Sequence, residues 1–199
     1  MGARADEALI QMSAGGLAAA IARGEVSAAE AVEAHIERIE QVNGALNAVV
    51  VKRYDEARAE ARAADEKRAR GEPLGPLHGV PITIKEHLDL TGTPSTFGLS
   101  SRASILATQD DAWVARVRAA GATILGKTNV SQLLLYHESD NPVYGRTNNP
   151  WNLERSPGGS SGGQAAIIAS GGSPLGLGTD IGGSIRVPAT SCGIVGMKP

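Results

Sequence analysis

The sequence predicts an α/β fold in which N-terminal helices precede a mixed sheet flanked by helices. Apolar residues recur at helical spacing within residues 10–43, and two short runs of β-branched residues follow at 79–85 and 123–126. A loop and a helix-forming stretch separate the two runs, and this order is typical of an α/β sheet. The 199 residues suffice for one domain with a buried core.

We expect this single domain, residues 1–199, to have a helical part and an α/β core. Residues 1–75 form the helical part and residues 76–199 the core. No internal repeat and no interdomain linker interrupts the chain. The division therefore follows the change from helical spacing to short β-branched runs.

Two helices are expected within residues 10–43. Ser27, followed three residues later by Glu30, has the pattern of a capping box that begins the second helix. Four residues then recur at helical spacing and predict its buried face: Val32, His35, Ile36 and Ile39. We therefore expect His35 to pack in the core.

A surface helix and a buried strand come next. Residues 52–70 are rich in Ala, Glu, Lys and Arg, which predicts a solvated helix ended by Gly71 and Pro73. Residues 79–85 form a short apolar run of β-formers, which predicts a strand. Lys85 ends this strand, so its amine is expected in buried surroundings.

The remaining elements are shorter. Residues 91–108 predict a loop, and Asp110 or Asp111 can begin a helix that runs through Ala120 and stops at Gly121. The elements expected after this helix are, in order, a strand at 123–126, a polar loop at 137–157, a helix from Gln164 to Ser170 and a strand from Pro174 to Thr179.

Composition and charge argue against several function classes. A net charge of −2 gives no electrostatic case for a nucleic-acid or membrane partner, and 3% aromatic residues leave few platforms for stacking bases. The single cysteine, Cys192, fits a reducing compartment. Residues 1–6 lack the apolar core of a signal peptide, and no apolar run is long enough to span a bilayer, so we expect the cytoplasm. No zinc motif occurs, and no metal or cofactor is expected.

A glycine- and serine-rich stretch at residues 158–163 carries chemical information. It opens into an apolar helix, where Ser161 and Gln164 have capping-box spacing, which argues against a flexible linker. Its Gly-x-Ser-x-Gly pattern matches a nucleophile elbow, but that site needs a histidine after the serine. All four histidines precede Ser160: His35, His78, His87 and His137. Dinucleotide, Walker and Ser-x-x-Lys motifs fail as well.

Since histidine bases are excluded, a lysine is the remaining candidate to activate a serine. Burial lowers the pKa of a lysine and so populates its neutral amine. Lys85 is the best candidate because it alone ends an apolar strand. An ordinary buried lysine paired with Glu86 or Asp89 is the alternative, and the residues alone leave both open.

Several motifs, in this order, resemble the amidase signature family. They are Leu77 to Lys85, Gly126 to Asn129, Asn149 to Asn152, Ser156 to Gly163, Gly176 to Arg186 and Cys192 to Pro199. The spacings from Lys85 to Ser160 and from Ser160 to Ser184 are also similar to those of the family. The resemblance covers most of the chain and implies the amidase signature fold.

The resemblance also implies roles. Ser184 is the implied nucleophile that forms an acyl-enzyme, and Ser160, joined to Gly159 by a cis peptide bond, relays its proton to Lys85 as base. The implied oxyanion hole consists of the backbone N–H groups of Ile181, Gly182, Gly183 and Ser184. Leu134 lies where the acyl-binding region of the family begins.

Three further positions have structural expectations. Asp180 is expected to order the glycine turn, Arg186 to form a salt bridge near the site, and Cys192 to be a small buried packing residue. For Arg186, binding of an anionic substrate is the alternative.

The implied function is hydrolysis of carboxamides to an acid and ammonia or an amine. A small amide and water are the expected partners, and a homodimer is left open. The alternatives are the glutaminase (A) subunit of a tRNA-dependent amidotransferase and an inactive fragment of an amidase. The family's catalytic domain continues well beyond the second serine, so we expect a domain truncated at its C-terminus.

Overall fold

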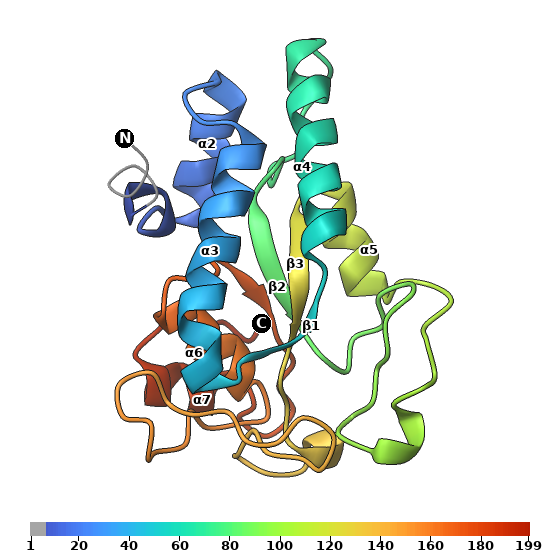
Figure 1. The fold of residues 1–199 in the computed structure, drawn as a ribbon, viewed down its shortest axis with the longest axis vertical. Helices are drawn as coiled ribbons and strands as arrows, with labels where there is room; N and C mark the ends of the chain where they lie inside the picture. The colour runs from blue at the N-terminus through green and yellow to red at the C-terminus, as the bar shows by residue number, and fades with distance from the viewer. Residues whose placement is uncertain (1–6) are drawn as a thin grey trace.

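A four-stranded mixed sheet organises the fold (Figure 1). The computed structural model describes residues 7–199; residues 1–6, where no signal peptide was expected, lie outside the described residues. The strands lie in the order β1 (Val49–Lys52), β3 (Thr123–Thr128), β2 (Pro81–Lys85) and β4 (Gly176–Leu177). β2 runs parallel to both β3 and β4, and β1 is antiparallel to β3. The predicted α/β fold with a mixed sheet is thereby confirmed.

Helices pack around this sheet. In chain order they are α2 (Ala14–Arg23), α3 (Ala28–Leu46), α4 (Tyr54–Ala69), α5 (Ala112–Ala119), α6 (Gly162–Ala169) and α7 (Arg186–Cys192). α3 and α6 both contact β2 and β3, and α6 also contacts α7 (Figure 1). Two short 3-10 turns, Ser100–Arg102 and Gln132–Leu134, lie in the connecting segments.

The N-terminal helices form as their sequence predicts. The side chain of Ser27 accepts the N–H of Glu30, and the carboxylate of Glu30 accepts the N–H of Ser27, so the capping box that begins α3 is present. The buried face of α3 includes Val32, His35 and Ile39. His35 packs in the core as expected, and its Nδ1 lies 2.8 Å from the carbonyl oxygen of Ala31.

The core lies between α3 and the sheet. Ile82, Ile84, Ile124 and Leu125 from the two central strands are fully buried or nearly so, and they join one apolar cluster with the inner face of α3. Because β2 and β3 are buried along their whole length, polar groups at their ends are held in apolar surroundings.

The structure also corrects three expectations. β1 and α7 were not predicted: β1 is a four-residue strand that pairs with the distant β3, and α7 is only seven residues long. β1 occupies residues 49–52, so the charged helix α4 begins at Tyr54 rather than at residue 52. The expected capping box of Ser161 and Gln164 is wrong: Ser161 makes no side-chain cap. Gln164 instead hydrogen-bonds Thr83 and Thr128 on the sheet.

β1 lies within residues 1–75 and pairs with β3, so the sheet draws on both expected parts of the chain. The division of the chain at residue 75 stays a prediction.

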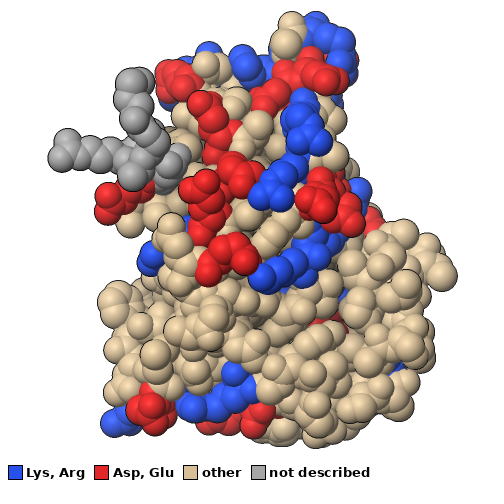
Figure 2. Space-filling model, viewed as in Figure 1, with Lys and Arg blue, Asp and Glu red and all other residues tan. Residues whose placement is uncertain are grey.

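Figure 2 shows acidic and basic side chains intermingled over the end that holds α3 and α4, whereas the opposite end is mostly uncharged. Within residues 7–199, no helix combines the length and the apolarity needed to cross a membrane.

Candidate active site

Lys85 ends the central strand β2, at the edge of the sheet where parallel strands commonly place their ligand sites. Its side chain is completely buried. The Nζ atom donates to Ser160 Oγ at 2.8 Å, to Thr179 Oγ1 at 3.1 Å and to the carbonyl oxygen of Thr179 at 3.2 Å. The fold therefore brings together Lys85 and Ser160, which are 75 residues apart in the chain.

Burial controls the protonation of this amine. Desolvation lowers the pKa of Lys85 from 10.5 to about 7, against the opposing negative charge of Asp180. The alternative ion pair with Glu86 is not made, because the Glu86 carboxylate accepts the backbone N–H groups of Thr96 and Phe97 instead. A large share of Lys85 is consequently a neutral amine near neutral pH.

Ser160 is fully buried in the turn that leads into α6, and the Gly159–Ser160 peptide bond is cis. The turn is closely packed: a Cβ atom on Gly159 would clash with the backbone of Glu138. A side chain on Gly163 would come within 2.5 Å of the Asn129 backbone nitrogen. The backbone of this turn therefore has no room for added side chains, and among residues 7–199 the partner of Ser160 Oγ is Lys85 Nζ.

Ser184 lies in the turn before α7 and is 9% exposed. Its carbonyl oxygen accepts the N–H of Ser161 at 3.1 Å, which ties the two serine-containing turns together. Within residues 7–199, the Oγ atom of Ser184 has no hydrogen-bond partner. The Lys85–Ser160 part of the implied relay is thus present, whereas the Ser160–Ser184 hydrogen bond is not made in this structure.

Asp180 orders the turn that carries Ser184. Its carboxylate accepts the N–H groups of Gly183 at 2.7 Å and Ile185 at 3.0 Å, together with the guanidinium of Arg186 at 2.9 and 3.0 Å. These contacts, that of Arg186 first, hold the pKa of Asp180 well below its usual range. The structural roles expected for Asp180 and Arg186 are both present.

The four implied oxyanion donors differ in whether their N–H group is already hydrogen-bonded within the protein. The N–H group of Gly183 is occupied by Asp180. Among the described residues, the N–H groups of Ile181, Gly182 and Ser184 donate to no other group. Three of the four implied donors are therefore available to a ligand oxygen. The side chain of Ile181 is fully exposed, so this turn faces solvent.

The segment that carries Leu134 contacts this turn through His137. Leu133 and Leu134 adopt left-handed backbone conformations, with φ of 54° and 61°, an uncommon choice for leucine. The same segment brings His137 Nε2 to 3.2 Å from the carbonyl oxygen of Gly182. His137 was not predicted to contact the site, since nothing in its local sequence marks it.

A second buried lysine supports the neighbouring loop. Lys127 on β3 donates to the hydroxyl of Ser95 at 2.9 Å and to the carbonyl oxygen of Pro94. Desolvation lowers the pKa of Lys127 to about 8, with Glu86 and Asp89 acting in the opposite direction. Lys127 has no hydrogen bond to Ser160 or Ser184, so it is separate from the cluster around Lys85.

Sequence reasoning missed Thr179 as a member of the cluster. Its hydroxyl and its carbonyl oxygen both accept from Lys85, and the carbonyl oxygen also accepts from Ser161 Oγ at 3.3 Å. The one signal available was its position directly before Asp180 in the second glycine-rich stretch. Cys192, by contrast, is buried as expected, and burial raises the pKa of its thiol to about 12.

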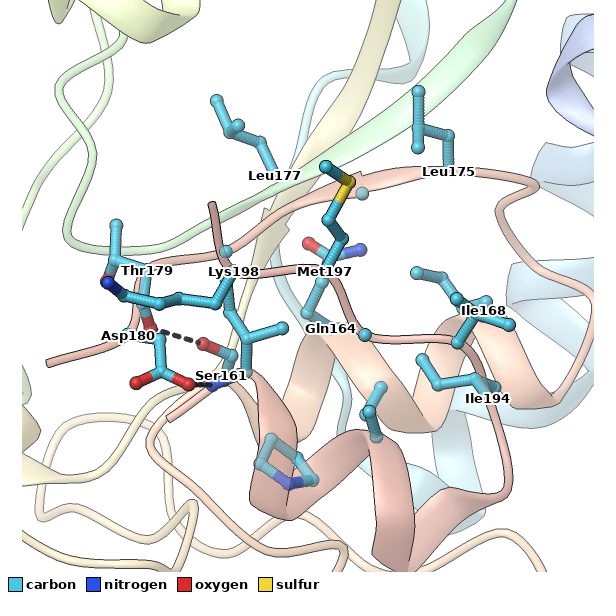
Figure 3. A pocket seen from close by; sticks show the side chains of 18 of the residues that line it. Ser161, Gln164, Ile168, Leu175, Leu177, Thr179, Asp180, Ile194, Met197 and Lys198 are labelled. Atoms are coloured by element: carbon cyan, nitrogen blue, oxygen red, sulfur yellow. Dashed lines mark hydrogen bonds between the residues drawn. The ribbon is translucent and has the colours of Figure 1, made fainter. Parts of the chain in front are cut away.

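A hollow of about 790 Å³ lies beside the cluster (Figure 3). Its walls come from β4, α6 and the C-terminal segment, and Thr179 and Asp180 form part of one wall. Leu175, Ile168 and Met197 make much of the lining apolar (Figure 3). Within residues 7–199, no three His, Cys, Asp or Glu side chains gather in a way that could hold a metal ion.

A buried lysine on a serine with a cis peptide bond, next to a second serine in a glycine-rich turn, defines a candidate acyl-transfer site. The family model for amidases, described as Amidase, matches residues 30–199. The chain belongs to the amidase family, and the resemblance noted in its sequence is confirmed.

Two of the curated relatives carry names of different function. The chain is 48% identical over 198 residues to "Fatty-acid amide hydrolase 2-B" of Danio rerio. It is 45% identical over 191 residues to the A subunit of a glutamyl-tRNA(Gln) amidotransferase from Thermobifida fusca (strain YX). Each match covers 96% of this chain and 38% of the relative. The chain therefore spans well under half the length of these relatives.

Solved structures agree on the fold. A structure titled "Fatty acid amide hydrolase" superposes with a TM-score of 0.89 at 35% identity, over 92% of this chain and 32% of that one. A bacterial aryl acylamidase of the amidase signature family superposes with a TM-score of 0.86 at 38% identity, over 89% and 37%. The described residues thus have the architecture of amidase signature enzymes.

Proposed function

We propose that this chain carries the catalytic residues of a serine amidohydrolase that cleaves the C–N bond of carboxamides. The observation that carries the proposal is the 2.8 Å hydrogen bond between the buried Lys85 amine and Ser160 Oγ, beside the turn that holds Ser184. A lysine whose pKa is lowered to about 7 can accept a proton at neutral pH. Membership of the amidase family supports the reaction class.

In the proposed reaction, Ser184 Oγ attacks the carbonyl carbon of the amide. Its proton passes to Ser160 Oγ, while the proton of Ser160 passes to Lys85 Nζ. Since these two hydroxyls are not hydrogen-bonded in this structure, the first transfer requires Ser184 to turn toward Ser160.

The developing negative charge on the substrate oxygen is stabilised by the N–H groups of Ile181, Gly182 and Ser184. The relay then returns a proton to the leaving amine, and the C–N bond breaks. Water hydrolyses the acyl-enzyme through the same relay, releasing the acid and restoring Ser184. The proposed substrate is a small amide.

A glutaminase subunit of a tRNA-dependent amidotransferase is the second candidate. Its support is the 45% identity to a relative of that name, close to the 48% found for a fatty-acid amide hydrolase. Such a subunit hydrolyses glutamine and passes the ammonia to a partner. Glutaminase activity that appears only with a partner protein would favour this candidate, whereas amide hydrolysis without a partner would favour the first.

The proposed setting is the cytoplasm, in keeping with the single cysteine. A single domain with its catalytic core in residues 76–199 is part of the proposal, and a homodimer remains open. An inactive fragment is the outcome to be excluded. In that case the chain would bind hydrophobic dyes in a molten state.

The test is covalent labelling of the purified 199-residue chain with a serine-reactive fluorophosphonate, with the adduct mapped by mass spectrometry. The expected adduct is on Ser184, lost in Ser184→Ala and in Lys85→Ala. Ser101→Ala, at an exposed serine of the 3-10 turn 100–102, is the control and should label like the wild type. A folded chain that is unlabelled, or labelled equally in Ser184→Ala, would refute the proposal.

A further inference from the structure

His87 lies two residues beyond Lys85, just after β2, and its ring extends the cluster by one more side chain. Its Nε2 atom lies 3.3 Å from Thr179 Oγ1. Thr179 Oγ1 lies 3.1 Å from Lys85 Nζ, which is 2.8 Å from Ser160 Oγ. The four side chains form a continuous line of hydrogen-bond contacts that ends at the serine.

The imidazole in this line is neutral. Burial, reinforced by the positive charges of Lys85 and Lys127, lowers the pKa of His87 to about 3. A neutral imidazole has one nitrogen that donates and one that accepts. Its Nδ1 atom is buried without a hydrogen-bond partner among the described residues. Because Nδ1 lacks a partner in either tautomer, the contact of Nε2 with Thr179 decides where the proton resides.

The protons around Lys85 can be counted. The charged Lys85 donates to Ser160, whereas the neutral amine can accept a hydrogen bond from the Ser160 hydroxyl in the same contact. The neutral amine then has two N–H groups to donate, and the two acceptors in reach are the carbonyl and hydroxyl oxygens of Thr179. A hydroxyl that accepts from Lys85 must direct its own hydrogen elsewhere. Among the described residues, His87 Nε2 is the other atom within hydrogen-bond reach of that hydroxyl.

We propose that His87 is a positioning residue: its Nε2 accepts the Thr179 hydroxyl proton, which keeps the lone pair of Lys85 directed at Ser160. Without this acceptor, the Thr179 hydroxyl can turn its hydrogen onto the Lys85 lone pair and compete with Ser160. The effect on chemistry rests on the proposed function. The tautomer that the inference requires, with the proton on Nδ1, does not.

The surroundings fix the ring in this place. The Phe97 ring meets His87 edge-on, with centroids 5.4 Å apart and an interplanar angle of 70°. Phe97 is itself held by its N–H, which donates to the buried Glu86 carboxylate at 3.1 Å. Three charged groups act on the contact between His87 and Thr179. Lys85 and Lys127 act on His87 directly, and Asp180 acts through Lys85.

The first test needs no activity. In ¹⁵N-histidine NMR spectra of the full chain, the signal lost in His87→Phe should show a neutral ring with its proton on Nδ1. This signal should not titrate between pH 5 and pH 8, and Thr179→Val should shift it. A proton on Nε2, or a signal unaffected by Thr179→Val, would overturn the inference whether or not the chain is an amidase.

The second test measures the rate of fluorophosphonate labelling of Ser184 against pH. His87→Phe keeps a ring beside Phe97 but removes the acceptor, so the plateau rate should fall at least about tenfold with no shift of the midpoint to higher pH. His87→Gln, whose amide oxygen can accept, should label faster than His87→Phe. In a Thr179→Val background, His87→Phe should have no further effect, because the two residues act as a unit.

His35→Gln provides the control for loss of a buried histidine, since His35 packs in α3 away from the cluster. It should lower stability without changing the pH profile of labelling. The positioning role would be overturned if His87→Phe were labelled at the wild-type rate, or if His87→Phe and His87→Gln lost the same share of the labelling rate. It would also be overturned if His87→Phe lowered the labelling rate as much in the Thr179→Val background as in the wild type. Absence of labelling in the wild type would instead reject the proposed function, and the NMR result would still decide the tautomer.

Discussion

Replacing Lys85 by methionine should make the protein more stable in acid, while Ser184 should no longer react with the fluorophosphonate. The folded-state pKa of Lys85, about 7, lies below its ordinary value of 10.5. Between these two pH values the unfolded chain holds a proton that the folded chain has released. Stability of the wild type therefore rises as pH rises through this window. Below pH 7 the full penalty of burying the charged amine is present.

The magnitude follows from the two pKa values. At about 1.4 kcal/mol per pKa unit, the complete penalty is roughly 5 kcal/mol, of which about 4 kcal/mol disappears between pH 6 and pH 10. Methionine fills a similar volume without charge, but it leaves polar partners on Ser160 and Thr179 unsatisfied, at a cost of about 1–3 kcal/mol. The variant should thus be favoured at pH 6 and lose its advantage at pH 10.

Urea unfolding of the wild type and of Lys85→Met at several pH values measures this difference directly. Lys127 is present in both chains, so its own titration largely cancels. Lys198→Met removes one exposed positive charge and serves as the control. The reasoning would be refuted if the difference in unfolding free energy between the wild type and Lys85→Met stayed constant from pH 6 to pH 10. Burial would then not lower the pKa of the Lys85 amine.

Three further predictions concern the scaffold. Asp180→Asn should lower the free energy of unfolding at pH 7 by about 3 kcal/mol, because it weakens charged hydrogen bonds. The wild type should lose this contribution as the pH falls below the usual carboxyl pKa, whereas Asp180→Asn should not; parallel acid unfolding curves would contradict this. Gly163→Ala should destabilise by about 2 kcal/mol or more, since the new Cβ would press on the Asn129 backbone, whereas Gly44→Ala, with open space around it in α3, should stabilise by about 0.5–1 kcal/mol in thermal unfolding. Ser27→Ala should cost about 1 kcal/mol in urea unfolding through loss of the α3 cap, and an unchanged midpoint would count against the capping box.

Elements with a clear local signal were predicted best. α3 begins at a capping box recognisable from two residues, and β2 is a short run of β-formers that is buried along its length. β1 was missed although it contains three consecutive valines, because its four residues lie between two helix-forming stretches and pair with β3, far along the chain. α7 was missed because its seven residues, with Pro188 among them, depend on the turn that Asp180 ties down.

The candidate site divides in the same way. Lys85 could be singled out from its place at the end of an apolar strand and Ser160 from its glycine-rich turn, whereas Ser184 was implied by the resemblance to the amidase signature family. Thr179 and His87 could not, because each is an ordinary residue in its local sequence, and their contact joins segments 92 residues apart. The occupation of the Gly183 N–H by Asp180 likewise depends on the exact path of the turn.

The tight packing around Gly159 and Gly163 has a consequence for large-scale mutational surveys of this chain. Substitutions there would fail because an added Cβ meets backbone atoms. Substitutions of Ser160 and Ser184 would fail because these serines carry the chemistry of the proposed site. A survey scored by growth or abundance would therefore merge both causes into one intolerant stretch. Only a survey that scores folding and labelling separately would distinguish residues that react from those that must be small.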